Sequence, residues 1–328
     1  MSTTTTGTLA KQYVERWKNT PSLTLAKKLF KEHPLVFTDI DQARHRIRYY
    51  RGQLGVKNRS TLTDRGNIKK TVRDPFKLPR SYAKKRPPVD LEGTKFLMLY
   101  DTHIPYHDNE SIELAISEGE KQGCDTIFLG GDTIDCHLLS NFVKDPEARK
   151  FREEIEAARQ LFDYLRQRFP TARIYFKEGN HEERFWKYMR VKAPEVLDEE
   201  FVSLEAILKL KEFNIQWING RTKARIGRLS VFHGHEFGKS IMSPVNIARG
   251  LYLKAKASSI CGHYHQTSEH TERDVNDKMI TCWSIGCLSE LSPEYSPFNK
   301  WNHGFAIIKK DGENFHVQNF RIYKGRLL

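Results

Sequence analysis

The chain has 328 residues, of which 38% are hydrophobic, so it can bury a full core and still carry a second small domain. No apolar run approaches the ~20 residues that span a bilayer, and the N-terminus lacks the basic and apolar pattern of a secretory signal. The five cysteines are odd in number and scattered, which argues against a disulfide framework. We therefore expect a soluble protein of a reducing cytoplasm.

The positive charge is concentrated in the first quarter of the chain. Residues 1–88 hold 21 Lys and Arg against 6 Asp and Glu, a net of +15, whereas the whole chain is +13, which leaves residues 89–328 at −2. This asymmetry predicts a polyanion-binding module joined to a near-neutral body. We expect its partner to be nucleic acid, and DNA in particular; a solubilising tail is the alternative.

Residues 1–55 predict three short helices. Apolar side chains recur at helical spacing from Leu9 to Trp17, which indicates the first helix. Ser22 is a candidate N-cap for the second helix, and Thr38-Asp39 can cap the third.

The third predicted helix carries a stripe of basic side chains, formed by Arg44, Arg48 and Arg51. Three short helices that end in an arginine face resemble a helix-turn-helix unit, in which such a face contacts nucleic acid. A three-helix module that docks onto another protein is the alternative.

Residues 56–89 are basic and poor in apolar periodicity, which predicts a linker. Pro87-Pro88 closes this linker, because stiff prolines do not enter a central strand. The main domain is therefore expected to span residues 90–328.

In the main domain, short apolar runs alternate with helical patterns. Strands are predicted at residues 95–100, 126–129, 173–176, 213–218, 229–232 and 258–261, and helices near 110–122, 146–169 and 245–256. This alternation argues for a layered α/β sheet. Further strands are expected near the C-terminus, and Asp311-Gly312 predicts a hairpin turn between the last two.

Five of the predicted strands end in side chains that can bind a metal ion. These sets are Asp101 with His103, Asp132, Asn180 with His181, His233, and His263 with His265. In open α/β sheets, ligands bind at the carboxyl ends of the strands. Each set alone has an ordinary explanation as a turn or a helix cap, but all five in this order predict a metal site.

These sets stand in motifs that resemble those of the calcineurin-like metallophosphoesterase family. The motifs are Asp101-x-His103, Gly131-Asp132-x-x-Asp135, Gly179-Asn180-His181-Glu182, His233-Gly234 and Gly262-His263-x-His265. The resemblance covers residues 92–328 and is specific for the superfamily but not for the substrate. It implies a four-layer α/β/β/α sandwich, here preceded by a small basic all-α domain.

The resemblance also implies a pair of divalent metal ions bridged by Asp132. The first ion would take Asp101, His103, Asp132 and His265, and the second would take Asp132, Asn180, His233 and His263. We expect manganese, because it tolerates oxygen-rich octahedral sites with mixed ligands. Iron, zinc and nickel are the alternatives.

By the same resemblance, His181 would not bind metal but would protonate the leaving-group oxygen. Asp135 would orient His181 and favour its protonated form, with a helix N-cap as the alternative role. His235 is open between an alternative ligand, a supporting group and a substrate contact. Cys136 stands where the family's Ser/Thr protein phosphatases carry a phosphate-binding arginine, which argues against that class. Arg184 is nearby, but the sequence does not give its direction.

The expected function is that of a dinuclear-metal-dependent phosphoesterase that hydrolyses phosphoester bonds with a metal-bridged hydroxide. We expect a phosphodiesterase or nuclease that acts on DNA. One alternative is a phosphomonoesterase or small-nucleotide phosphodiesterase whose N-terminal module only targets it to nucleic acid. Another is a non-catalytic binding protein that has kept the fold. A helix-turn-helix-like head on a phosphoesterase would suit a phage or mobile-element protein.

Overall fold

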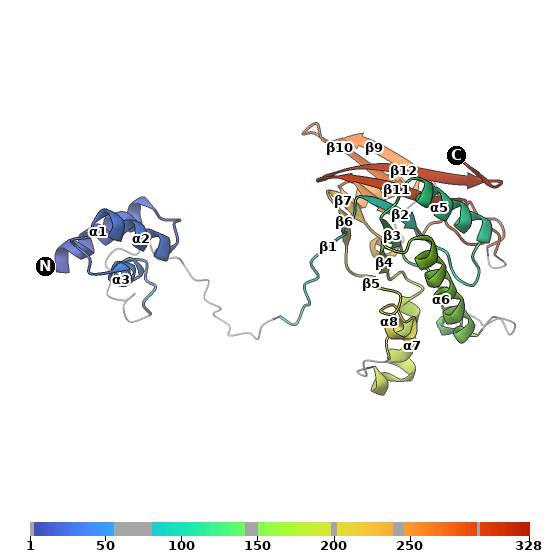
Figure 1. Ribbon diagram of the computed structural model, residues 1–328, viewed down its shortest axis with the longest axis horizontal. Helices are drawn as coiled ribbons and strands as arrows, with labels where there is room; N and C mark the ends of the chain where they lie inside the picture. Colours follow the sequence, from blue (N-terminus) through green and yellow to red (C-terminus); the bar gives the residue numbers. More distant parts are fainter. Residues whose placement is uncertain (1–2, 56–80, 142–149, 198–201, 239–245, 294–295) are drawn as a thin grey trace. The chain divides into compact units, whose positions relative to one another are not determined.

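The computed structural model describes residues 3–55, 81–141, 150–197, 202–238, 246–293 and 296–328 (Figure 1). The chain divides into two compact units, residues 1–83 and 84–328, and each is treated separately below. Most of the expected linker at 56–89 lies outside the described residues. Within the described ranges, none of the helices has the length and apolar content needed to cross a bilayer.

The N-terminal unit contains three helices, α1 (Thr3–Arg16), α2 (Ser22–Glu32) and α3 (Ile40–Tyr50). They enclose a small apolar core that includes Val14, Leu25 and Ile47. The cap expected for the third helix is present, since the carboxylate of Asp39 accepts a hydrogen bond from the Gln42 amide at 2.6 Å.

The cap expected for the second helix is wrong by one residue. Pro21 occupies the N-cap position, and it offers no side-chain hydrogen bond. Ser22 is instead the first helical residue, because its hydroxyl donates to the side-chain oxygen of Gln53 at 2.9 Å.

The second unit is built on two β-sheets. The larger sheet contains, in spatial order, β13 (Arg326–Leu327), β12 (Asn314–Tyr323), β11 (His303–Asp311), β2 (Lys95–Leu99), β3 (Thr126–Leu129), β4 (Arg173–Lys177) and β5 (Ile215–Ile218). The smaller sheet contains β1 (Val89–Asp90), β6 (Ala224–Ile226), β7 (Leu229–Val231), β8 (Ser259–Cys261), β10 (Met279–Ser284) and β9 (Ser268–Arg273). Neighbouring strands from β2 to β5 run parallel, as do β7 and β8.

The central strands β2, β3 and β4 of the larger sheet are buried on both faces, and β2 shows this most simply. Leu97 and Leu99 point into a core shared with the helices α5 (Asn109–Lys121) and α6 (Phe151–Arg168), which pack on one face (Figure 1). Phe96 and Met98 point the other way, into a core shared with the smaller sheet. Because both faces are covered, the strand is apolar throughout instead of alternating.

The smaller sheet is covered on its outer face by α9 (Ile247–Ala255), whose Leu251 packs against Cys261 and Cys282. The layers therefore follow in the order helix, sheet, sheet, helix. This order confirms the predicted α/β/β/α sandwich. The shorter elements are α7 (Glu183–Lys192), α8 (Leu204–Ile207), η1 (His137–Leu139), η2 (Pro194–Val196) and η3 (His235–Phe237).

Some boundaries differ from those expected. The strand predicted from residue 213 begins at Ile215, because the chain turns through Lys209 and Asn214, which both have left-handed backbones. The long helix predicted from residue 146 is described from Phe151 onward, and residues 146–149 lie outside the described part. The polar strand β9 was not predicted, since its sequence Ser-Glu-His-Thr-Glu-Arg carries no apolar alternation.

Candidate metal centre

The five predicted ligand sets follow five strands that belong to both sheets. Asp101, Asp132 and Asn180 come after β2, β3 and β4 of the larger sheet, while His233 and His263 come after β7 and β8 of the smaller one. Since parallel strands end at a common edge, the loops of each sheet gather there. Short distances between side chains join the loops of the two sheets into one site.

The first group of side chains is Asp101, His103 and His265. One candidate ligand atom from each lies within 4.8 Å of those of the other two. The Nε2 atoms of His103 and His265 are 3.2 Å apart, and His265 Nε2 is 3.6 Å from Asp101 Oδ1. All three side chains are buried.

The second group is Asp132, His233 and His263, whose candidate ligand atoms again lie within 4.8 Å of one another. Asn180 joins this group, because its Oδ1 is 3.2 Å from His233 Nε2. The structure therefore brings together every residue that was expected to hold the second ion.

Asp132 lies between the two groups. Its Oδ2 is 3.2 Å from His233 Nε2 on one side and 3.9 Å from His103 Nε2 on the other. Burial acts to raise the pKa of Asp132, but the nearby histidines, His181 and His233 foremost, lower it well below its ordinary value. A buried carboxylate in this position can contact an ion in either group, which is what a bridging ligand must do.

The backbone at five of these ligand positions is left-handed. The φ angles are 53° at Asp101, 46° at His103, 49° at Asp132, 71° at His263 and 56° at His265. Non-glycine residues avoid this region, at a cost of about 1–2 kcal/mol each. Such strain persists where the surroundings enforce it, and it gathers at functional sites.

Several buried polar atoms in the site also lack a hydrogen-bond partner among the described residues. They are Oδ1 of Asp101, Nδ1 of His263 and Nδ1 of His265. Buried polar atoms without partners are rare in folded proteins. Strained backbones, orphaned polar atoms and a donor set of carboxylates and imidazoles together fit a pair of divalent transition-metal ions.

Two sheets between helical layers, with five ligand-bearing loops meeting at their common edge, match the architecture that the motifs implied. The chain therefore has the layered α/β/β/α architecture and the clustered ligand-type side chains that the motifs predicted.

No protein-family model matches the chain, and no curated protein matches it. Among solved structures, a Zn²⁺ complex of Vps29 from Entamoeba histolytica is similar at 11% identity and a TM-score of 0.37, covering 71% of this chain and 96% of that one. A predicted phosphoesterase from Streptococcus pneumoniae is similar at 14% identity and 0.31, covering 73% and 97%. The phosphoesterase Yfce from E. coli is similar at 13% and 0.31, covering 66% and 89%. All three TM-scores lie below 0.5, so these similarities assign no role to residues of this chain.

Asp135 contacts both His181 and His103. Its Oδ1 lies 2.9 Å from His181 Nδ1 and 3.0 Å from His103 Nδ1. Burial disfavours a charge on His181, but Asp132 and Asp135 outweigh it and raise the pKa of His181. The N-cap position of η1 belongs to Cys136, so Asp135 does not cap that helix. The structure thus places Asp135 where it can orient His181, and the roles of both stay predictions.

Arg184 points into the metal centre. Its Nη1 donates to the backbone carbonyl of Asp135 at 2.8 Å, and its Nη2 lies 3.0 Å from His181 Nε2. Cys136, by contrast, is fully buried. A guanidinium therefore reaches the site from the first turn of α7, although the position after Asp135 lacks one. The sequence signal was an arginine three residues after His181, but its direction depended on where α7 begins.

Glu182 connects two of the ligand loops. Its fully buried carboxylate accepts hydrogen bonds from the amides of Asp132, Thr133, Ile134 and Gly179, at 2.7–3.1 Å. Glu236 plays a similar part beside His233. Its carboxylate accepts a hydrogen bond from the His233 amide at 3.2 Å and pairs with the buried Lys177 at 3.0 Å. The sequence analysis assigned no role to either glutamate.

His235 lies beside the metal centre but outside the groups of candidate ligands. Its ring centroid is 5.2 Å from that of His233, and its Nε2 is 3.5 Å from Glu183 Oε1. Of the roles left open for it, this position favours a supporting or substrate-contacting one.

The arginines predicted to bind nucleic acid are not equivalent. Arg51 donates to the Trp17 carbonyl at 2.9 Å and to the Ser22 hydroxyl at 3.0 Å, so it fastens the three helices together. Arg51 thus has a structural role within the unit, and its contact with nucleic acid stays a prediction. Arg44 and Arg48 are half-buried on α3 and remain candidate contacts.

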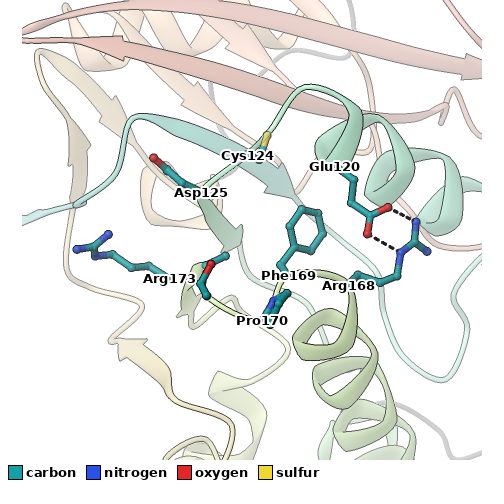
Figure 2. Close-up of a pocket in the computed structure, with 9 residues that line it drawn as sticks. Glu120, Cys124, Asp125, Arg168, Phe169, Pro170 and Arg173 are labelled. Carbon is teal, nitrogen blue, oxygen red and sulfur yellow. Dashed lines mark hydrogen bonds and ion pairs between the residues drawn. The ribbon is translucent and has the colours of Figure 1, made fainter.

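A pocket of about 420 Å³ lies at the opposite edge of the larger sheet (Figure 2). Asp125 and Arg173, which line it, stand at the starts of β3 and β4, whereas the metal ligands follow the ends of these strands. Arg168 in this pocket is paired with Glu120 and Glu113. The pocket is thus separate from the candidate metal centre, and salt-bridged side chains line it.

Proposed function

We propose that this protein is a metal-dependent phosphodiesterase that hydrolyses DNA. The observation that carries the proposal is the position of Asp132 between two groups of candidate ligands. The first ion would be held by Asp101, His103, Asp132 and His265, and the second by Asp132, Asn180, His233 and His263. When bound, such ions supply Lewis acidity and offset the charge of a phosphoester. We propose manganese as the native metal.

The remaining side chains of the site suit the other needs of the reaction. His181 is held at Nδ1 by Asp135, and its Nε2 accepts a hydrogen bond from Arg184 Nη2 at 3.0 Å, so Nε2 can carry a proton to the leaving oxygen once that guanidinium donates to a phosphate instead. The Nη2 atom of Arg184 lies next to that nitrogen and can donate to a phosphate oxygen.

DNA as the substrate is supported by the charge of the chain. Residues 1–88 carry a net of +15 while residues 89–328 carry −2, so affinity for a polyanion is concentrated outside the catalytic domain. The three-helix unit carries part of this charge, since residues 1–55 hold 10 Lys and Arg against 4 Asp and Glu, a net of +6.

An activity panel tests the proposal. The full chain, loaded in turn with Mn²⁺, Fe²⁺, Zn²⁺ or Ni²⁺, is assayed on p-nitrophenyl phosphate, bis-p-nitrophenyl phosphate, and single-stranded and double-stranded DNA. We expect metal-dependent diester and DNA hydrolysis that is lost in Asp132→Asn. If a folded, metal-loaded protein hydrolyses none of these substrates, the proposal is wrong and a non-catalytic binding protein is favoured.

The division into two units supports a second candidate, in which the N-terminal unit only targets a phosphomonoesterase or small-nucleotide phosphodiesterase to nucleic acid. The metal centre lies wholly within residues 84–328. Preference for the monoester or for the small diester over DNA in the same panel would favour this candidate.

A further inference from the structure

A second hollow, of about 300 Å³, lies beside helix α7. Five basic side chains and one aromatic ring from three separate parts of the chain line it, together with Glu178, Glu183 and Asn219. We call it the basic pocket and define it by Lys84, Arg86, Trp186, Lys187, Arg190 and Arg221. All six residues belong to the catalytic unit.

Most of the positive charge in the basic pocket is not neutralised by the protein. Lys187 is paired with Glu183 at 2.9 Å. Within the described part of the chain, Lys84, Arg86, Arg190 and Arg221 form no ion pair. Lys84 and Arg86 belong to the basic residues 1–88, but Arg190 and Arg221 lie in residues 89–328, whose net charge is −2, so their place in the pocket does not reflect a generally basic domain. It indicates a site for an anion with several charges.

Trp186 adds an apolar surface to this charged hollow. Its ring packs edge-on against Phe185, with centroids 5.3 Å apart, and it remains only partly buried. The same residue lines the pocket. Aromatic rings combined with a positively charged groove are typical of sites for single-stranded nucleic acid, where the ring stacks on a base and the cations contact phosphates.

The basic pocket adjoins the metal centre through the first turn of α7. Glu183 lines the pocket, and its Oε1 lies 3.5 Å from His235 Nε2. The ring of His235 is in turn 5.2 Å from that of His233, a candidate ligand. The next residue, Arg184, reaches His181. A polynucleotide with one phosphate at the metal centre would therefore place a neighbouring nucleotide at the basic pocket.

We propose that the basic pocket binds the nucleotide next to the scissile phosphate of single-stranded DNA. Trp186 stacks on the base, and Arg190 and Arg221 contact the adjoining phosphates. A single strand is favoured over a duplex because stacking on Trp186 requires an unpaired base. This inference rests on the proposed phosphodiesterase function and adds the form of the substrate.

The test uses the full metal-loaded chain with a single-stranded oligonucleotide, the matching duplex and bis-p-nitrophenyl phosphate. We expect the double variant Arg190→Ala/Arg221→Ala to raise KM for the single strand about tenfold, and to lower the salt slope of oligonucleotide binding by about 2. We expect Trp186→Ala to weaken binding of the single strand by about tenfold or more. Trp186→Phe should restore most of this lost affinity. Turnover of the small diester stays unchanged in all of them.

Arg273→Ala is the matched control, because Arg273 is an exposed arginine on β9 that pairs only with Asp277 in the described structure. Single-strand cleavage that is unaltered in both the double-arginine and the Trp186 variants would overturn the inference. An equal loss on the duplex, with no effect of Trp186→Ala, would overturn the base-stacking site.

Oligonucleotide binding by metal-free protein separates this inference from the proposed function. If the wild type hydrolyses no DNA, the proposed function fails. The same variants then show, by their affinity for the single strand, whether the basic pocket still binds it. Variants that match the wild type in this assay would overturn the binding site itself.

Discussion

His181 is the residue whose role the geometry defines most sharply. It shares a group of possible ligand atoms with His103 and Asp132, yet Asp135 already holds its Nδ1 at 2.9 Å. We predict that His181→Ala keeps its metal and loses about 10²–10⁴-fold in kcat, the usual contribution of a general acid. Metal per chain and kcat are measured together on purified protein. Loss of an ion in the variant would instead make His181 a ligand.

Arg184 is the second residue-scale case. Its two terminal nitrogens contact the Asp135 carbonyl and His181. These contacts direct the guanidinium into the site, where it can bind phosphate. We predict that Arg184→Ala lowers kcat/KM on the order of 10²-fold, as loss of one charge-stabilising donor does. Arg184→Lys should restore only part, because an ammonium cannot donate in the planar fork. Steady-state kinetics on bis-p-nitrophenyl phosphate provide the measurement. Wild-type kinetics in Arg184→Ala would give the arginine a purely structural role.

At the scale of elements, α6 supports the loop that follows Asp132. Glu154 on this helix is almost fully buried, and its carboxylate accepts from the Cys136 amide at 2.8 Å. Burial, followed by the charge of Asp135, raises the pKa of Glu154 to about 7. The folded protein therefore holds a proton on this group that the unfolded chain releases at lower pH.

The sign of the resulting pH effect is determined by that shift. A raised carboxyl pKa contributes stability that is complete below the unfolded value of about 4.5 and is lost as pH rises through about 7. We predict that, between these two pH values, the free energy of unfolding of the wild type falls by up to about 3 kcal/mol relative to that of Glu154→Gln. Urea unfolding of both proteins, metal-free, at several pH values measures this difference. Parallel pH profiles would contradict the prediction. Glu156→Gln, an exposed change on the same helix, is the control.

At the scale of the whole molecule, the two units are expected to divide affinity and chemistry. We predict that residues 84–328 alone hydrolyse bis-p-nitrophenyl phosphate at the full rate, because every candidate ligand lies within them. Their affinity for DNA should fall at least tenfold at low salt, with a shallower salt dependence, since the removed residues 1–83 carry a net of +12 (18 Lys and Arg against 6 Asp and Glu) out of +13 for the whole chain. Fluorescence anisotropy across a salt series provides the measurement. A truncated protein that binds and cuts DNA like the full chain would show that the N-terminal unit does not select the substrate.

The sequence predicted the layers and the gathering of ligands for a simple reason. Apolar runs that end in ligand-type side chains mark the ends of parallel strands, and parallel strands end at one edge. The contacts of Arg184 and Glu182 could not be predicted in this way, because each depends on how a loop meets another loop distant in sequence. The contacts of Arg51 could not be predicted for the same reason: helical spacing gives the face on which a residue lies, but not that Trp17 and Ser22 accept hydrogen bonds from its guanidinium.

The left-handed backbone at five ligand positions has a consequence for how this protein responds to selection. Glycine at Asp101, His103, Asp132, His263 or His265 would remove the backbone penalty together with the ligand. Relief of that penalty acts to stabilise the metal-free protein, whereas loss of the side chain removes a candidate ligand. Stability and activity are thus in direct competition at these positions. Laboratory evolution for heat resistance alone would be expected to erode the metal centre before it altered the surrounding sheets.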